Sequence, residues 1–475
     1  MTSQQKTVAI LGAGVAGMSA ACALAEAGFR VRLLERRTYL GGRASSYLHP
    51  GVGEVIDNCQ HALFGCCTNL LGFYRRIGVE PQIHWTTGMT MIEPGGRRSA
   101  LGPVGLPAPL HGLPKLLSAS AFTLADKLAL ARAFRAMMRP IPADSTESLA
   151  AWLARHGQTE GALRRFWRLV IASALNAELE AIAVPYAAKV IRELFMNSAW
   201  AGAMGMSRVP LSQLYAPVPE FLAAHGGSVE FGAHADAACW DEATRQWTIT
   251  TRTGSVEADF VVAALPFEAM GKLTDALPFT PGVSALREQI AAHTHWPICS
   301  VHLWFDRPVT ELEHAVLLDR EIHWMYNQSR LQGRPGNYIE LVVSATRSFA
   351  ALERNAAIEL ALRELSDFFP AVREAKLEKV VLIKEVRATF GVSPGIDRAR
   401  PASADSPWPH LYLAGDWTRT GWPSTMESAA RSGHLAAEAV ARAAGHGGRW
   451  LEPDLKPSGL MRLLGFRSQR NTSQE

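Results

Sequence analysis

The sequence predicts an α/β protein in which one discontinuous domain is built from both ends of the chain. Residues 7–35 have the pattern of a strand, a helix and a second strand, and such a unit implies a parallel sheet. Another buried strand followed by a helix is expected near the far end, at 411–414 and 425–444. The residues between these two parts have a different character, which indicates inserted segments.

Local sequence accounts for the first unit. Residues 7–11 are a short apolar run that ends at a glycine, as buried strands do. Residues 15–27 are rich in alanine and other helix formers, and Gly28 suits the end of a helix. Residues 29–35 alternate as a second strand and finish at the acidic Glu35.

The inserted segments are predicted to be of two kinds. Residues 94–115 are rich in proline and glycine, typical of a loop, and helices follow from about 118 to 200, with a capping box at Thr123–Asp126 and another helix opening at Asp144–Glu147. Later segments favour strands at 228–263, 298–305, 337–344 and 379–390, with a helix at 355–369. We therefore assign 1–100, 211–285 and 385–445 to a nucleotide-binding domain, 101–210 and 286–384 to a mixed α+β substrate domain, and 446–475 to a tail.

Composition excludes several classes of protein. The chain has 475 residues, of which 48% are hydrophobic and 19% charged, so it can bury a large core. The net charge is only +4, so the chain lacks the excess of positive charge that is typical of nucleic-acid-binding proteins. No apolar run approaches the ~20 residues that span a bilayer, and no secretory signal is evident. The six cysteines suggest neither a disulfide framework nor a metal site. A cytoplasmic protein is expected.

The first motif is a glycine-rich turn between the strand and the helix. Gly12-Ala-Gly14-Val-Ala16-Gly17 has the G-x-G-x-x-G spacing, in which the glycines permit a tight turn, close approach of a pyrophosphate and close packing of the helix. The helix N-terminus offers free N–H groups to phosphate. Glu35 suits ribose hydroxyls, and Arg36 beside it is assigned to the same site. Together they predict dinucleotide binding.

A second glycine turn follows at Gly41-Gly42-Arg43, where the arginine could lie over the pyrophosphate. By itself this is an ordinary turn beside a surface arginine. Following Glu35, however, it makes residues 8–43 resemble the N-terminal signature of the FAD-dependent amine oxidase and carotenoid desaturase superfamily. The resemblance implies FAD as cofactor and a nucleotide domain like that of glutathione reductase, discontinuous and carrying an inserted substrate domain.

The far end of the chain resembles the same superfamily. A strand ends at Gly415-Asp416, and a helix opens near Thr425-Met426 with small residues along it. Asp416 could bind hydroxyls of the cofactor, and the positive end of the helix could face the flavin edge that becomes anionic on reduction. The alternative is a plain strand–turn–helix capped by Asp416.

The stretch Asp57-Asn58-Cys59-Gln60-His61 distinguishes families within the superfamily. It resembles the hydroxysqualene dehydroxylases, although glycine is expected where this chain has Cys59. That resemblance implies reduction of hydroxysqualene to squalene by hydride from reduced flavin. Loss of hydroxide needs an acid, and His61 and Asp57 are the candidates for it or for its hydrogen-bond network. The alternative for His61 is a structural residue beside the flavin.

Other functions stay open at this stage. A carotenoid or other isoprenoid desaturase would run from oxidised flavin, and an amine oxidase or a non-catalytic lipid carrier are further alternatives. No second complete G-x-G-x-x-G is present, so a separate electron donor is expected. Because such lipids reside in membranes, peripheral attachment to the inner face is expected. Residues 455–467 could anchor the protein there, or be a frayed terminus.

Overall fold

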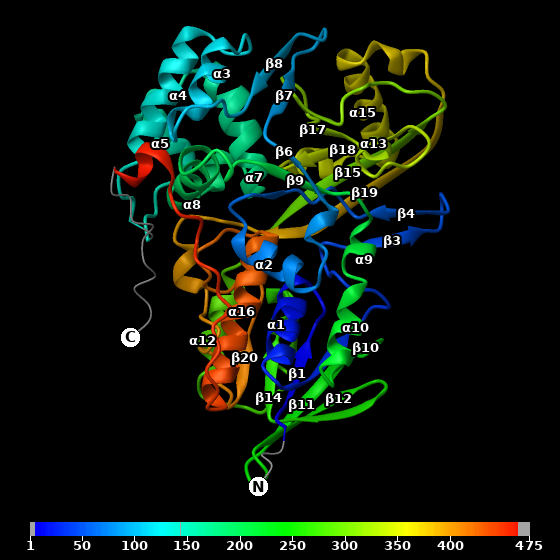
Figure 1. Cartoon of the computed structure of the whole chain (residues 1–475), viewed down its shortest axis with the longest axis vertical. Coiled ribbons are helices and arrows are strands. Elements are labelled where there is room, and N and C mark those ends of the chain that lie inside the picture. The colour runs from blue at the N-terminus through cyan, green and yellow to red at the C-terminus, as the bar shows by residue number, and fades with distance from the viewer. Residues whose placement is uncertain (1–4, 143, 464–475) are drawn as a thin grey trace.

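The computed structural model describes residues 5–142 and 144–463 (Figure 1). Its helices are α1 (Val15–Glu26), α2 (Thr68–Arg76), α3 (Leu113–Ser118), α4 (Leu124–Met137), α5 (Leu149–Arg155), α6 (Glu160–Ala162), α7 (Ala172–Leu175), α8 (Val184–Val190), α9 (Leu211–Leu214), α10 (Pro217–Ala224), α11 (Phe267–Leu273), α12 (Val283–Ala291), α13 (Gln328–Leu331), α14 (Arg347–Ala351), α15 (Arg354–Phe368) and α16 (Met426–Ala443). Its strands are β1 (Thr7–Leu11), β2 (Arg30–Glu35), β3 (Ser46–His49), β4 (Glu54–Asp57), β5 (Leu63–Phe64), β6 (Ile83–Thr86), β7 (Met89–Ile92), β8 (Arg98–Leu101), β9 (Met204–Ser207), β10 (Ser228–Phe231), β11 (Ala235–Asp241), β12 (Gln246–Thr251), β13 (Gly254–Ala258), β14 (Phe260–Ala263), β15 (His295–Phe305), β16 (His314–Leu317), β17 (Trp324–Asn327), β18 (Tyr338–Ser344), β19 (Leu377–Phe390) and β20 (Leu411–Leu413).

A five-stranded parallel sheet forms one half of the molecule, in the order β10-β2-β1-β14-β20. Its central strands are buried, as expected where helices cover a parallel sheet. The strand β20 comes from the far end of the chain and lies beside β14. The predicted α/β class and the joining of both chain ends in one sheet are thus confirmed.

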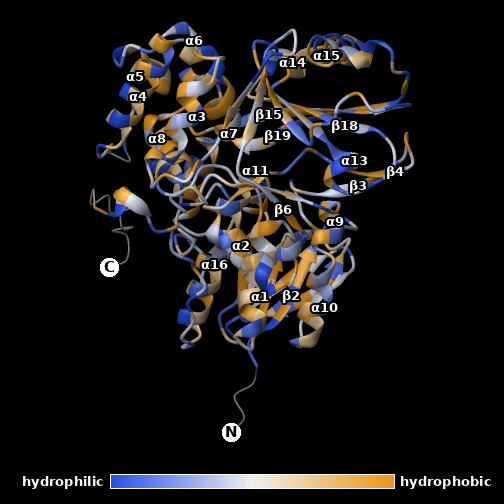
Figure 2. Ribbon diagram, turned by 45° about the horizontal axis from the view of Figure 1, so that its top comes forward, coloured by the Kyte–Doolittle hydropathy of each residue, from blue (hydrophilic) through white to orange (hydrophobic). Residues whose placement is uncertain are grey.

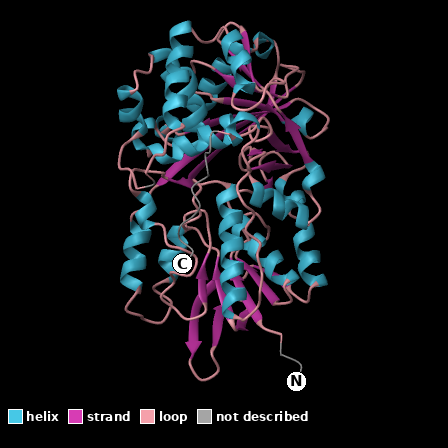
Figure 3. Cartoon of the chain, turned by 60° about the vertical axis from the view of Figure 1, so that its left-hand side comes forward, coloured by secondary structure: helices cyan, strands magenta, loops and turns pink. Residues whose placement is uncertain are grey.

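A seven-stranded mixed sheet forms the other half, in the order β19-β15-β18-β17-β16-β7-β8. Figure 3 shows the two groups of strands at opposite ends of the molecule. Alternate residues of β18 point to opposite faces. Ile339, Leu341 and Val343 pack with residues of α15, whereas Val342 faces the interior between the halves. Helices α3, α4, α5, α7 and α8 lie beside this sheet (Figure 1).

Several predicted bounds differ from the structure. Strands β7 and β8 belong to the seven-stranded sheet, because β7 pairs in parallel with β16 and antiparallel with β8. The boundary predicted at residue 100 therefore lies within β8, and both strands belong with the substrate half. β19 likewise crosses the boundary predicted at 384. The segment 94–115, expected as a loop, contains β8 and the start of α3. The wider division into domains stays a prediction.

Of two predicted helix starts, the structure confirms one and shifts the other. The capping box of α4 is present, since Thr123 and Asp126 bind each other's main chain N–H groups. The helix expected to open at Asp144–Glu147 begins instead at Leu149, where the Ser148 hydroxyl accepts a hydrogen bond from Ala151 N at 3.3 Å. Over the residues that the structure covers, none of the helices has the length and apolar character needed to cross a bilayer.

Candidate active site

A cavity of about 1130 Å³ lies between the two halves of the molecule. One part is lined by the glycine turns and the ends of β2 and β20. The other part is lined by apolar side chains from α3, α4 and the segment 166–196. Of the thirteen predicted cofactor-binding residues all but one line it: Gly12, Gly14, Ala16, Glu35, Arg36, Gly41, Gly42, Arg43, Gly415, Asp416, Thr425 and Met426.

The glycines of the first turn have distinct physical reasons. Gly12 has a φ of +98°, a backbone angle that residues with a side chain rarely adopt. A Cβ on Gly14 would meet nothing closer than the Cα of Gly42 at 4.0 Å, so that position is open. Gly17, the one predicted residue away from the cavity, faces inward: its Cβ would lie 1.9 Å from the carbonyl oxygen of Gly12. Gly17 therefore serves close packing of α1, as predicted.

Glu35 fixes the shape of this turn from the end of β2. Its carboxylate accepts hydrogen bonds from Ala13 N at 2.8 Å and from Arg37 N at 2.9 Å. Both oxygens are thus oriented by the main chain, and the side chain lines the cavity. Each carboxylate oxygen has a second lone pair, which suits a ribose hydroxyl.

Arg43 and Asp416 form an ion pair on the cavity wall. Arg43 also donates to the carbonyl oxygen of Ala388 at 3.1 Å, and the hydroxyl of Ser424 donates to Asp416. Fully buried Arg400 donates to the carbonyl oxygen of Asp416 at 3.0 Å. The sequence patterns did not single out Arg400, because a lone arginine carries no local signal of its burial.

The N-terminus of α16 opens on the same cavity. Thr425 caps it, since its hydroxyl accepts a hydrogen bond from Ser428 N at 3.1 Å. Thr425 and Met426 both line the cavity. The positive end of an eighteen-residue helix therefore faces this space, as predicted.

The cavity has features that FAD binding requires. The N-termini of α1 and α16 both lie at the cavity, close to glycines of the cavity wall. The Glu35 carboxylate also lies there and could accept hydrogen bonds from a ribose. The open position at Gly14 leaves room for a phosphate where any side chain would intrude. The residues present fit an FAD molecule: Gly14, Glu35 and Arg43 would hold its nucleotide, and Thr425 and Met426 would face its flavin.

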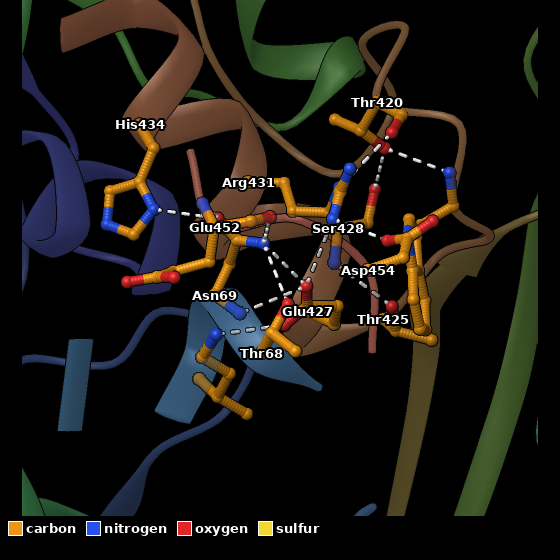
Figure 4. A network of polar contacts seen from close by, with 12 residues as sticks. Thr68, Asn69, Thr420, Thr425, Glu427, Ser428, Arg431, His434, Glu452 and Asp454 are labelled. Atoms are coloured by element: carbon orange, nitrogen blue, oxygen red, sulfur yellow. Dashed lines mark hydrogen bonds and ion pairs between the residues drawn. The ribbon is translucent and has the colours of Figure 1, made fainter. Parts of the chain in front are cut away.

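A network of buried polar groups supports α16 from behind (Figure 4). Glu427 accepts hydrogen bonds from the main chain N–H groups of Asn69 and Leu70, at the N-terminus of α2. Arg431 lies 2.8 Å from Asp454, which also accepts from Trp422 Nε1 at 3.0 Å. These contacts hold the tail against α16 near Asp454. Residues 464–467 of the predicted anchor lie outside the described residues.

The apolar part of the cavity would suit a long hydrocarbon. Its wall carries Leu116, Leu130, Phe134, Phe166, Val170, Phe195 and Met196 on the helical side and Ile298, Trp324, Tyr326 and Val342 on the sheet side. Such a lining excludes water and offers few directional contacts, so the polar groups at its edge decide orientation.

His61 is one of those polar groups. It lines the cavity, and its Nδ1 donates to the carbonyl oxygen of Cys59 at 2.7 Å, which leaves Nε2 as an acceptor. Burial lowers the pKa of His61 to about 4, so the ring is neutral at physiological pH. The geometry therefore suits a hydrogen-bond acceptor and differs from the proton donor considered above.

Asp57, the other predicted catalytic residue, is not among the residues that line the cavity. Its Oδ1 accepts a hydrogen bond from Leu211 N at 3.1 Å, the first residue of α9. Burial raises the pKa of Asp57 to about 7. The carboxyl group connects β4 to α9 and does not reach the cavity wall, so Asp57 is not placed to be the acid itself. Its other predicted role, in the hydrogen-bond network of the acid, stays a prediction.

Glu340 and its neighbours were missed by the sequence analysis. Glu340 lies fully buried on β18, where it accepts from Gln60 N and Gln328 Nε2, both at 2.6 Å. Burial, reinforced by the charge of Asp57, raises the pKa of Glu340 to about 8, so this carboxyl group holds a proton at neutral pH. Tyr326 faces Glu340 across the strand pair and lines the cavity. The available signal was a lone glutamate inside the apolar run of 338–344.

Comparison with known proteins agrees with this geometry. A family model described as flavin containing amine oxidoreductase matches residues 15–441. The chain is 26% identical over 457 residues to a 15-cis-phytoene desaturase of Synechococcus elongatus, covering 91% of this chain and 95% of the relative. It is 25% identical over 485 residues to a probable zeta-carotene desaturase of the same organism, covering 92% and 98%.

Solved structures show the same fold. An oxidoreductase from Methanosarcina mazei superposes with a TM-score of 0.70 at 16% identity, covering 92% of this chain and 100% of that one. Since the family model spans most of the chain and its glycine turns, ion pair and capped helix surround one cavity, the chain belongs to the flavin containing amine oxidoreductase family and is an FAD-dependent oxidoreductase.

Proposed function

We propose that this enzyme reduces an allylic isoprenoid alcohol, hydroxysqualene, to squalene. The observation that carries the proposal is the composition of the cavity wall. A long apolar lining continues from the cofactor-binding residues, and His61, Gln60 and Tyr326 form a small polar edge on it. Behind that edge Glu340 holds a proton at neutral pH. A hydrocarbon with one hydroxyl group matches such a site.

The reaction needs a hydride at carbon and a proton at oxygen. FAD, when bound in its reduced form, supplies the hydride. The carbon–oxygen bond breaks, the hydroxyl group leaves as water with one proton, and a new carbon–hydrogen bond forms. The substrate is thereby reduced by two electrons. Hydroxide is a poor leaving group, so the chain's main task is to hold the proton near the oxygen.

Three side chains would share that task. The free Nε2 of His61 would accept a hydrogen bond from the substrate hydroxyl, which orients its oxygen. The Tyr326 hydroxyl, which has no hydrogen-bond partner among the described residues, would donate to the same oxygen; burial keeps its pKa high and its proton in place. Glu340, which is the cross-strand partner of Tyr326, would supply the proton from behind that hydroxyl group. The surrounding apolar residues would exclude water from the reacting carbon.

A separate electron donor belongs to the proposal. The reduced cofactor must be regenerated after each turnover, and the sequence has only one complete G-x-G-x-x-G. We propose that a distinct reductase or free reduced flavin supplies these electrons.

A second candidate is desaturation of an isoprenoid. It is supported by the relatives named as phytoene and zeta-carotene desaturases, which match 91–92% of this chain. This reaction would start with oxidised FAD and remove hydrogen from a saturated bond. The two candidates therefore differ in the direction of electron flow and in the need for a substrate hydroxyl.

One experiment separates the candidates. The purified holoenzyme is reduced without oxygen, hydroxysqualene is added, and flavin absorbance and squalene are followed together. Reoxidation matched by squalene formation supports the dehydroxylase. Flavin that stays reduced with intact alcohol overturns it, and oxidised enzyme with phytoene is then the test of desaturation. Tyr326→Phe removes only the hydroxyl group and is expected to slow the first reaction.

A further inference from the structure

Exposed apolar side chains gather on one side of the substrate half. Thirteen large apolar residues are exposed among those that the structure describes. Eight of the thirteen are leucines of the segments 106–128 and 460–463. We call these the leucine face: Leu106, Leu110, Leu113, Leu117, Leu124, Leu128, Leu460 and Leu463. Leu124 and Leu128, one turn apart on α4, are 69% and 59% exposed. An exposed apolar patch of this extent marks an interaction site.

Contacts hold the segments of the face together. Leu460 N donates to the carbonyl oxygen of Ala108 at 2.9 Å, which places the C-terminal turn against the loop before α3. Lys127 Nζ donates to the carbonyl oxygen of Leu117 at 2.7 Å, which joins α4 to α3. Figure 1 shows α3, α4 and the red C-terminal turn on the same side of the molecule, and Figure 2 shows the mixed hydropathy of these segments.

The face adjoins the cavity. Pro109, His111, Gly112 and Leu116 line the cavity from the same segment, and Leu113 both lines it and is exposed. One short piece of chain therefore separates solvent from the apolar chamber. A molecule that reached the face would be one layer of side chains from the site.

The charged residues of the segment that carries most of the face are almost all positive. Residues 103–142 contain five cations (Lys115, Lys127, Arg132, Arg135 and Arg139) and a single carboxylate, Asp126. Asp126 is buried and engaged in the capping box of α4. Arg462 adds another cation beside Leu460. Because the whole chain carries only +4 net charge, this is a local concentration.

We propose that the leucine face docks on an anionic lipid bilayer and admits the isoprenoid to the cavity. At a bilayer surface, leucines insert among the acyl chains, and neighbouring lysines and arginines bind the anionic headgroups. A second copy of the chain would bring like charges together in a two-fold contact. Only the identity of the lipid rests on the proposed function. The predicted anchor in the tail contributes Leu460 and Leu463, but α3 and α4 form most of the face.

Vesicle binding tests the proposal without any substrate. The holoenzyme is sedimented with vesicles of phosphatidylcholine, alone or mixed equally with phosphatidylglycerol. We expect binding to the mixed vesicles, weakened by salt, and much less to the neutral ones. The triple variant Leu117→Gln/Leu124→Gln/Leu128→Gln changes only residues away from the cavity lining. It is expected to bind at least about tenfold more weakly, since three leucines no longer insert.

A matched control uses exposed apolar residues elsewhere. Phe279→Gln and Leu48→Gln, at positions 85% and 65% exposed, should leave binding unchanged. Unaltered binding by the triple variant, or no binding by the wild type, would overturn the proposal. So would a wild-type dimer that the triple variant converts to monomer without any vesicle binding. Failure of squalene formation with vesicle binding intact would instead refute only the proposed reaction.

Discussion

Arg43 and Asp416, 373 positions apart in the sequence, form an ion pair on the wall of the cofactor cavity. Burial by itself would raise the pKa of Asp416, but the Arg43 guanidinium, the Ser424 hydrogen bond and Arg400 together lower it. The carboxylate therefore stays ionised and connects the first glycine turns to the last strand. The pair joins the two ends of the chain where the cofactor is expected.

Asp416→Asn keeps the size of the side chain and removes its charge. We expect the free energy of unfolding to fall by about 2–5 kcal/mol, because Arg43 loses its buried partner, and the FAD content to fall with it. Asp405→Asn is the control, since its pair with Arg419 is exposed and worth about 0–1 kcal/mol. Chemical denaturation and the flavin-to-protein absorbance ratio measure both effects. Equal losses in the two variants would contradict the assignment.

Two glycines of one turn should respond differently to alanine. At Gly14 a Cβ would enter open space with acceptable backbone angles, so Gly14→Ala is expected to fold normally but to bind FAD at least about tenfold more weakly. At Gly17 a Cβ would collide with the carbonyl oxygen of Gly12, so Gly17→Ala is expected to destabilise the apoprotein itself. Thermal unfolding of both apoproteins, with flavin titration, checks this. A destabilised Gly14→Ala apoprotein would contradict it.

The sequence predicted the parts of the site that local spacing encodes. Gly12, Glu35 and Thr425 each sit at a defined distance from a strand or helix end, so their place on the cavity wall follows from one element. The Tyr326–Glu340 contact depends instead on the register between β17 and β18, which no local pattern contains. The place of Asp57 away from the cavity wall could not be predicted for the same reason: the partner of its carboxyl group, α9, lies 154 positions later in the chain.

Glu340 should make stability depend on pH. A carboxyl group whose pKa is raised by folding, here to about 8 from an unfolded value of about 4.3, favours the folded state most at low pH. Its contribution is lost as the pH rises from about 4 to 8. We expect Glu340→Gln to flatten the decline in unfolding free energy over this range. Denaturant midpoints at intervals of pH measure it, and an unchanged slope would show that Glu340 is ionised in the folded protein.

His61 should affect turnover without titrating near neutrality. Because burial lowers the pKa of His61 to about 4, the ring is neutral from about pH 5.5 upward. We expect His61→Ala to retain FAD and to lower kcat/KM for hydroxysqualene at least about tenfold, through loss of the Nε2 acceptor. The wild-type rate profile should lack a step near pH 6.5. Normal turnover by His61→Ala would leave the residue a purely structural role.

The polar network behind α16 should couple the tail to the cofactor site. Asp454 is kept ionised because Lys189 and Arg431 outweigh the effect of its burial on the pKa. Asp454→Asn leaves Arg431, itself only 6% exposed, beside an uncharged partner. Because Glu427 stays 3.6 Å from Arg431, loss of the charged hydrogen bond to Asp454 is expected to cost about 1.5–3 kcal/mol. The first turn of α16 would then be held less firmly, so FAD affinity should fall as well.

The control for this change is Asp144→Asn. Asp144 lies 3.6 Å from Arg398 in an exposed pair, and its loss should cost less than about 1 kcal/mol. Denaturation with and without added FAD separates the two effects. A smaller stabilisation by FAD in Asp454→Asn than in wild type or Asp144→Asn means that the network positions the helix end. An equal stabilisation in all three would mean that Asp454 only secures the tail, and that α16 keeps its place through packing against α1.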